Sequence, residues 1–393
     1  MKKYWKSISI SVIIVLSIGA FYVNTALSAE QYPAFVIETQ SGDSTEIKPL
    51  VLEGFYIDNY SRTNVKITSE GSTFNSNTFL NLIIGQPDER IKKLQEEYRG
   101  FMRGKIGSIN RYFEDKQQLV YAEVDYKRDS GRMSDFTYDI SLLNKEGGDS
   151  NDFTVKVPNN GELDYVNVDD VRLIENELYL LTRNSIRKND NYYYENHMYT
   201  IDIANQTITN HELLIEYSDG QGNQGDTYNN VEVVGTSRTT ANEHVILLKT
   251  GAEIKQEITV YNLATKEKEK IDVAELNLEN NQLSYTNDSM LYFTKLDGQE
   301  VVITSYNLVD DQIGNELTLQ LSDENGNVPT PMITVHNGKL YAATPHINGN
   351  LDGSVVVADV NSGETLFHGQ LALENSSQEM RSYDLFIDEI IFR

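Results

Sequence analysis

Apolar and polar residues alternate in short runs along most of the chain after residue 30. In the run ITVYNLATKEKEKIDV, residues 258–273, one alternating stretch ends at a small polar cluster and a second stretch follows it. Alternation with a period of two places one face of a strand in a core and the other face in water. The pattern therefore predicts antiparallel β-strands joined by polar turns.

Four segments of the chain repeat one order of features. Each has an asparagine, a short apolar strand, a polar loop, and a second alternating strand that ends in Asp or Asn before an aliphatic residue. The asparagines are Asn176, Asn242, Asn287 and Asn337, and the strand ends are Asp202, Asn262, Asn307 and Asp359. Asparagine tolerates the left-handed backbone of a tight turn, and an Asp or Asn at a strand end can cap the next turn. With the apolar stretch upstream of each asparagine, every unit has four strands, which is typical of a β-propeller blade.

The repeat extends beyond these four units in a weaker form. Residues 117–157 hold a fifth copy, residues 31–85 hold strand-like pieces, and residues 383–393 alternate again. At about 50 residues per blade, the sequence predicts an all-β fold, a β-propeller of about seven four-stranded blades. The last strand is expected to pair with N-terminal strands and close the ring. Unrelated hairpins or a two-sheet sandwich would also give short strands, but the fixed order of features favours the repeat.

Two of the units, VYNLATKEKEKIDV and VADVNSGETLFHG, carry a family resemblance. They resemble the degenerate blades of bacterial exported propellers of the quinoprotein-like kind, and the resemblance covers about residues 117–373. It implies the propeller architecture. It does not imply a quinone cofactor, because the regular tryptophan spacing of such propellers is absent and the one tryptophan is Trp5.

The start of the chain is a separate segment. Three lysines among the first six residues precede residues 7–29, which carry no charge. As a helix, this uncharged run would measure about 34 Å, enough to cross a hydrocarbon core of about 30 Å. The small residues up to Ala29 equally permit cleavage as a signal peptide.

The sequence therefore predicts two parts. Residues 1–29 are a signal peptide or an N-terminal membrane anchor, and residues 30–393 are a single β-propeller domain. The length of the apolar run favours the anchor, which gives a cell-membrane protein with one N-terminal span and an extracytoplasmic domain. Secretion after cleavage is the alternative.

The composition of the chain limits the kinds of partner that it can be expected to bind. The chain has 33 Lys and Arg against 59 Asp and Glu, a net charge of −26. A surface this acidic repels phosphate backbones, so nucleic-acid binding is not expected, and membrane contact is expected through the N-terminal helix only. The chain has no cysteine, which excludes disulfides, thiolate metal sites and a thiol nucleophile.

One helical insertion is predicted after the leader, at about residues 87–104. Pro87 suits the first turn of a helix, and Gly100 or Gly104 is expected to end it. Its apolar face would consist of Ile91, Leu94, Tyr98 and Phe101.

The same stretch is basic in an acidic chain, which suggests a docking surface for an acidic partner or anionic headgroups. The candidate partner-binding residues are Arg99, Phe101, Met102, Arg103, Lys105 and Arg111. The competing interpretation is an insertion that packs on the propeller and pairs with its acidic surface. It is favoured, because charge runs on surfaces are usually solvated.

Two loops are candidate ligand sites. Tyr192, Tyr193 and Tyr194 near a hairpin tip could stack on sugars or peptides, although an early strand start would instead bury one or two of these rings. In HINGNLDGSVVVAD, oxygen ligands at alternate positions before a glycine resemble a calcium loop. Its metal-ligand candidates are Asn348, Asn350, Asp352 and Asp359. A glycine-rich hairpin turn explains that segment equally well.

No pattern in the sequence identifies a catalytic centre. The six histidines lack metal-binding spacing, no serine elbow is present, and a carboxylate pair for glycoside hydrolysis cannot be chosen from sequence. We therefore expect no cofactor apart from calcium at the loop above. The leading hypothesis is an extracytoplasmic, membrane-tethered propeller that is a non-catalytic binding or sensor module for an envelope protein or small ligand. The alternative is a propeller hydrolase acting on an envelope polysaccharide or sugar.

Overall fold

The structure is a computed structural model of the whole chain. The described part leaves out residues 1–9, 11, 13, 20–31, 59–61, 75–88, 130, 189–190, 219–228, 235–242, 252–255, 273–281, 286–288, 298–299, 321–330, 348–351, 375–381 and 393. The chain divides into two compact units. The first comprises Met1–Gly85, Thr294–Thr304 and Asn315–Arg393, and the second comprises Gln86–Phe293 and Ser305–Gly314. The expected single domain over residues 30–393 stays a prediction.

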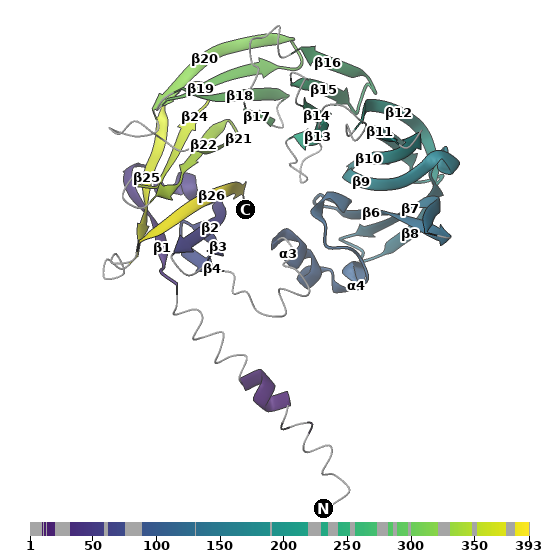
Figure 1. Cartoon of the computed structure of the whole chain (residues 1–393), viewed down its shortest axis with the longest axis horizontal. Helices are drawn as coiled ribbons and strands as arrows, with labels where there is room; N and C mark the ends of the chain where they lie inside the picture. Colours follow the sequence, from purple (N-terminus) through teal and green to yellow (C-terminus); the bar gives the residue numbers. More distant parts are fainter. Residues whose placement is uncertain are drawn as a thin grey trace, which may run out of the picture. The chain divides into compact units, whose positions relative to one another are not determined.

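Two five-stranded antiparallel sheets build the first unit (Figure 1). One has the order β1-β25-β24-β22-β21, with β1 at Phe35–Gly42, β25 at Thr365–Leu373, β24 at Ser354–Asp359, β22 at Lys339–Thr344 and β21 at Met332–His336. The other has the order β23-β26-β2-β3-β4, with β23 at His346–Ile347, β26 at Tyr383–Phe392, β2 at Leu50–Asp58, β3 at Arg62–Thr68 and β4 at Gly71–Phe74. One core cluster with Phe35, Leu52, Val357 and Leu385 packs between them.

Strands from the N-terminal and C-terminal parts of the described chain pair with each other in these two sheets. The C-terminal strand β26 pairs with β2 from Leu50↔Phe392 to Asp58↔Tyr383, so the predicted pairing of the last strand with an N-terminal strand is confirmed. In turn, β1 pairs with β25, a strand near the C-terminus. Such exchange satisfies strand edges that would otherwise be open for aggregation.

Three four-stranded sheets build most of the second unit, each a run of antiparallel hairpins (Figure 1). The first holds β5 at Tyr112–Glu114, β6 at Gln118–Asp129, β7 at Arg132–Asn144 and β8 at Ser150–Lys156. The next holds β9 at Leu163–Ile174, β10 at Glu177–Lys188, β11 at Asn191–Asp202 and β12 at Thr207–Ser218. The third holds β13 at Asn229–Val234, β14 at His244–Gly251, β15 at Glu257–Asn262 and β16 at Lys268–Asp272. Short 3-10 turns lie at Ile109–Arg111 and Asn160–Glu162 in this unit, and another lies at Ser44–Ile47 in the first unit.

A further four-stranded sheet has residues in both units. Its order is β17-β18-β19-β20, with β17 at Gln282–Tyr285, β18 at Met290–Asp297, β19 at Glu300–Asn307 and β20 at Gln312–Gln320. The described residues thus form six antiparallel sheets of four or five strands, and the predicted all-β propeller fold is confirmed. Six is fewer than the expected seven or so, because strands of 12 residues and the helical insertion use more chain than an average blade.

Turn caps explain why the repeat is visible in the sequence. Oδ1 of Asp202 accepts the backbone N–H of Ala204 and Asn205, and the carboxylate or amide oxygens of Asn262, Asn307 and Asp359 cap their turns in the same way. These bonds replace ladder partners that the chain loses as it turns.

The left-handed backbone position before each strand is less uniform than predicted. Asn337 has φ 49°, as expected, but before β10 and β18 the left-handed residues are Glu175 and Ser289. Asn176 itself is not among the residues with positive φ, and Asn242 and Asn287 lie outside the described residues. The chain can therefore make this turn without asparagine, so the asparagine marks the turn only loosely.

The predicted helical insertion is present as two short helices, α3 at Glu89–Glu97 and α4 at Arg99–Met102. Ile91, Leu94 and Phe101 are buried, so the predicted apolar face is confirmed. Tyr98 breaks the helix with φ −119° and ψ 47°. Gly100 continues the helix rather than ending it, and the left-handed Gly104 turns the chain afterwards.

Part of the leader lies among the described residues. Residues 10, 12 and 14–19 are helical, and apolar side chains such as Val15 and Leu16 are exposed by 67% and 66%. A search of the described residues finds no helix with the length and apolar character that crossing a membrane requires.

Candidate functional site

Strand alternation gives the β5–β8 sheet two different faces. Residues such as Val120, Ala122, Ile140 and Phe153 pack with the β9–β12 sheet in one core cluster. The residues between them point to the opposite face, because side chains alternate along a strand. That opposite face carries the candidate site.

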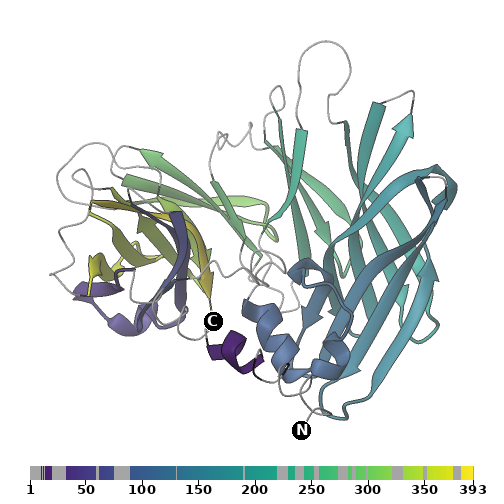
Figure 2. The same ribbon diagram turned by 60° about the horizontal axis from the view of Figure 1, so that its bottom comes forward.

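The two helices cover one end of this face (Figure 2). Ile91 and Leu94 of α3 and Phe101 and Met102 of α4 pack against Tyr112, Leu119, Tyr121 and Leu143 of the sheet. Burial of these apolar side chains holds the insertion in place, at about 1.5–3 kcal/mol per fully buried large residue. The loop after α4 is thereby fixed beside the sheet.

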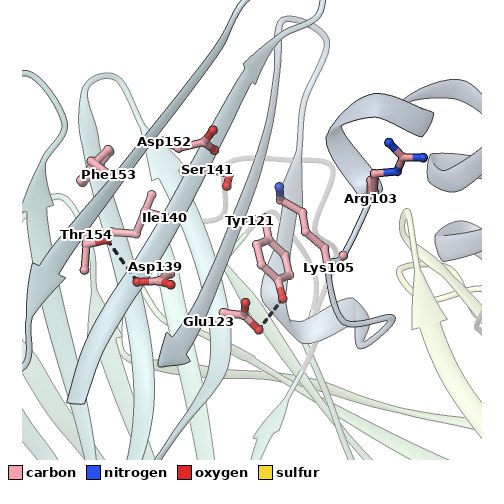
Figure 3. A pocket seen from close by; sticks show the side chains of 11 residues that line it. Arg103, Lys105, Tyr121, Glu123, Asp139, Ile140, Ser141, Asp152, Phe153 and Thr154 are labelled. Atoms are coloured by element: carbon pink, nitrogen blue, oxygen red, sulfur yellow. Dashed lines mark hydrogen bonds between the residues drawn. The ribbon is translucent and has the colours of Figure 1, made fainter. Parts of the chain in front are cut away.

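Beyond the helices the face is polar and forms an open groove of about 360 Å³ (Figure 3). Strand register places its residues in two rows, Tyr121–Ser141–Asp152 and Glu123–Asp139–Thr154, across β6, β7 and β8. Arg103, Gly104 and Lys105 of the loop after α4 line the other side. We call this feature the sheet groove.

The two cations of the sheet groove are held differently. Lys105 lies with its Nζ 4.3 Å from the centre of the Phe101 ring and 5.4 Å from that of Tyr121, a cation–π arrangement. Burial lowers the pKa of Lys105, and the negative charges of Asp152 and Glu123 oppose that change. Arg103 is exposed and, within the described residues, forms no ion pair.

The three carboxylates also differ in what they already bind. Glu123 accepts a hydrogen bond of 2.7 Å from the Tyr121 hydroxyl and lies 3.4 Å from Nη1 of Arg111. Asp139 accepts a hydrogen bond of 3.2 Å from Thr154. Asp152 is exposed and contributes its charge to Lys105.

A polar chain leads from the sheet groove into the β9–β12 sheet. Nη2 of Arg111 donates to Asn167 at 3.3 Å, and Asn167 donates to Asp169 at 2.6 Å. Asp169 lies 3.5 Å from Nη2 of Arg183. Burial raises the pKa of Asp169 despite the nearby Arg183 charge. The pairing of β9 with β10 skips Asp169, which is a bulge of the kind that redirects side chains.

The structure places the predicted partner-binding residues in four different settings. Arg103 and Lys105 line the sheet groove, and Arg99 is exposed on α4. Phe101 and Met102 are 9% and 5% exposed and pack in the core under α4, while Arg111 is half-buried against Glu123. Asp139, Ser141 and Asp152 were not among the predicted site residues, because only strand register brings them to the basic loop.

The tyrosine run is part of a strand. Strand β11 begins at Asn191, so the early strand start that the sequence allowed is what the structure has. Tyr194 stacks on Tyr217 at 5.4 Å and packs against a buried cluster. Tyr192 and Tyr193 lie opposite Arg187 and Ile186 of β10. A ligand role for these rings stays a prediction.

The proposed calcium loop is only partly within the described residues. Asn348 and Asn350 lie outside them. Asp359 uses Oδ1 to cap the turn after β24, and the exposed Asp352 lies 3.7 Å from His346. Among the described residues, no three His, Cys, Asp or Glu side chains form a group that could hold a metal ion.

The burial of four histidines leads to a prediction of how the stability of the fold depends on pH. Burial lowers the pKa of His211, His244, His336 and His346 from the ordinary value of 6.5. In the folded protein they stay neutral at a pH where the unfolded chain binds protons, so stability is lost as pH falls below 6.5. We expect the melting temperature to drop by several degrees between about pH 7.5 and about pH 5.5.

Thermal unfolding followed by circular dichroism measures this drop. Carboxylates with lowered pKa, such as Asp202 and Asp359, titrate below that window and do not contribute. A variant with glutamine at all four histidines should show a smaller drop than the natural chain. Equal melting temperatures at both pH values in the natural chain would contradict the prediction.

No protein-family model and no curated protein matches the chain. Solved structures do match. The β-propeller domain of the Trilobed protease from Pyrococcus furiosus is 12% identical, over 59% of this chain and 71% of that chain, with a TM-score of 0.34. TolB from Acinetobacter baumannii is 10% identical over 70% and 82%, with a TM-score of 0.25. Prolyl oligopeptidase B from Galerina marginata is 11% identical over 79% and 38%, with a TM-score of 0.35. The sheets themselves define the β-propeller fold, and no function is taken from these likenesses.

Proposed function

We propose that this chain is a non-catalytic binding module that acts at the cell envelope, outside the cytoplasm, and that the sheet groove is its recognition site. The observation that carries this proposal is the groove itself. It is open, its walls are held by packed helices and paired strands, and it presents both signs of charge. Preformed polar surfaces of this kind suit recognition, because little ordering is needed when a partner binds.

The hydrogen bonds and the ion pair within the groove favour a binding function over a catalytic one. Glu123 is occupied by Tyr121 and Arg111, and Asp139 is occupied by Thr154. A general acid near neutral pH needs a carboxyl group with a raised pKa. Burial raises the pKa of Asp169, and this residue does not line the groove.

The N-terminal segment supports a location of the domain outside the cytoplasm. Its described residues are helical and have exposed apolar side chains. Such an apolar helix suits either insertion into a lipid bilayer or export as a signal peptide. The absence of cysteine makes oxidising surroundings harmless. Either a single-pass anchor or secretion after cleavage fits this proposal.

The alternative is a hydrolase that acts on an envelope polysaccharide or sugar. Asp169 favours it, because a buried carboxyl group with a raised pKa is the property that a general acid needs. Its contact with Arg183 favours a structural ion pair instead. The binding module is therefore the better supported function.

A photo-crosslinking residue at the centre of the groove tests the proposal. Ser141→p-benzoylphenylalanine places the probe between Tyr121 and Asp152, and Ser134→p-benzoylphenylalanine places it near the other end of the same strand as a control. Irradiation of intact cells should give a discrete adduct from position 141, measured by gel and intact mass. Position 134 should give none.

A second substitution checks that capture depends on the groove. Adding Arg103→Glu should remove the adduct, because it reverses the charge of one wall. A folded protein with no adduct at position 141, or with equal adducts at both positions, would contradict the proposed site.

A further inference from the structure

The sheet groove has opposite charges on its two sides. Arg103 and Lys105 come from the loop after α4, while Asp139 and Asp152 come from strands β7 and β8 (Figure 3). The third carboxylate, Glu123, has Arg111 as its ion-pair partner. Two cations therefore line one side of the groove and two anions line the other.

We propose that the sheet groove binds a small zwitterion, a ligand of short-peptide size that carries an ammonium group and a carboxylate group. This inference rests on the proposed function, since it names the ligand class of the same groove. The carboxylate lies toward Arg103 and Lys105, and the ammonium group lies toward Asp139 and Asp152.

The cationic side is prepared for a carboxylate. The guanidinium of Arg103 offers a planar set of donors that matches a carboxylate, and within the described part of the chain it forms no ion pair. The Nζ of Lys105 lies 4.3 Å from the centre of the Phe101 ring, which is packed in the core, so the ammonium group is already positioned. A ligand carboxylate replaces water at donors that need no rearrangement.

The anionic side is prepared for an ammonium group. Ser141 pairs with Asp152 and Asp139 pairs with Thr154 across β7 and β8, so both carboxylates lie on the same face in adjacent rows. Within the described residues neither carboxylate forms an ion pair with a Lys or Arg at salt-bridge distance. An ammonium group has three donors, which two such carboxylates and the Ser141 hydroxyl can accept.

Size and charge together restrict the ligand. A volume of about 360 Å³ is near the lower end of ligand sites, which span roughly 300–1,000 Å³, and suits a short peptide. A ligand with only an acid group would bring no positive charge to the two aspartates. A ligand with only an amine would bring no negative charge to the two cations. A neutral ligand with both groups satisfies each side.

Capped peptides test this inference on the purified full chain. Calorimetry at low salt compares trialanine with its N-acetyl form, its C-terminal amide and the form with both caps. We expect trialanine to bind and each single cap to raise Kd by about tenfold or more, because each cap removes a charged group that makes strong hydrogen bonds. The doubly capped peptide should show no binding.

Two variants test which side of the sheet groove binds each charged group of the peptide. Asp152→Asn should make the protein nearly indifferent to the acetyl cap, and Arg103→Gln should make it nearly indifferent to the amide. Glu146→Gln and Lys92→Gln, at exposed positions outside the groove, should leave all four affinities unchanged. Circular dichroism checks that each variant is folded.

Free and doubly capped trialanine binding alike, or no peptide binding, would overturn the zwitterion. If a Ser141 adduct with another partner still forms in cells, the proposed function stands without this ligand class. If neither peptide nor adduct is found, both ideas are wrong.

Discussion

Gly54→Ala is expected to lower the free energy of unfolding by about 3 kcal/mol or more, at the upper end of overpacking effects. A Cβ at position 54 would overlap the backbone carbonyl oxygen of Phe386 and lie 2.9 Å from its carbonyl carbon. Backbone atoms cannot rotate away as a side chain can, so β2 and β26 would have to move apart. The register between these strands shifts at Glu53/Gly54, which marks the close approach.

Gly100→Ala is the matched control. Nothing lies within 4 Å of a Cβ at that position, and the residue is exposed in α4. The control should be neutral or stabilising by up to about 1 kcal/mol, since alanine favours helix more than glycine does. Urea unfolding followed by circular dichroism measures both variants. Equal midpoints for the two would mean that β26 does not approach β2 as the structure has it.

The repeat could be predicted from the sequence because its signals are local. Alternation of period two and an Asp or Asn at each strand end need no distant contact, and Asp202 and Asp359 do cap their turns. The pairing of the last strand with the N-terminal strands followed from the need to satisfy edges. The helix face could be read from spacing, and Ile91, Leu94 and Phe101 are buried.

The groove could not be predicted in the same way. Its basic residues were visible as a charged run, but the sequence could not show that Phe101 packs in the core while Arg103 lines the groove. Asp139 and Asp152 lie far along the chain from Lys105, and only the register of β7 with β8 aligns them. In a chain with 59 carboxylates, no local signal distinguishes these two.

The insertion explains how one blade acquires the sheet groove. The face of the β5–β8 sheet opposite to the one that packs with the β9–β12 sheet is apolar at Leu119 and Leu143, where α3 and α4 cover it, and polar at Asp139 and Asp152, where they do not. The same helices that bury the apolar end deliver Arg103 and Lys105 to the polar end. Packing energy thus fixes a loop whose charges are then available to a ligand.

Arg172→Met is expected to destabilise the protein by about 3–5 kcal/mol, the usual cost of breaking a buried ion pair from one side. Nε of Arg172 lies 2.7 Å from Asp170, and their side chains are 4% and 1% exposed. Methionine keeps much of the length of the side chain but removes the charge, so Asp170 stays buried and loses the attraction of Arg172. The loss follows from desolvation of that carboxylate.

A double-mutant cycle separates the pair from simple packing. Asp170→Asn together with Arg172→Met removes both charges, and this double variant should recover much of the lost stability. Lys127→Met, which breaks the exposed pair with Asp135, should leave the urea midpoint unchanged because water already screens it. If the double variant is as unstable as the sum of the two single variants, the charges do not act as a pair. Strand β9, which also carries Asn167 and Asp169, would then owe its position to other contacts.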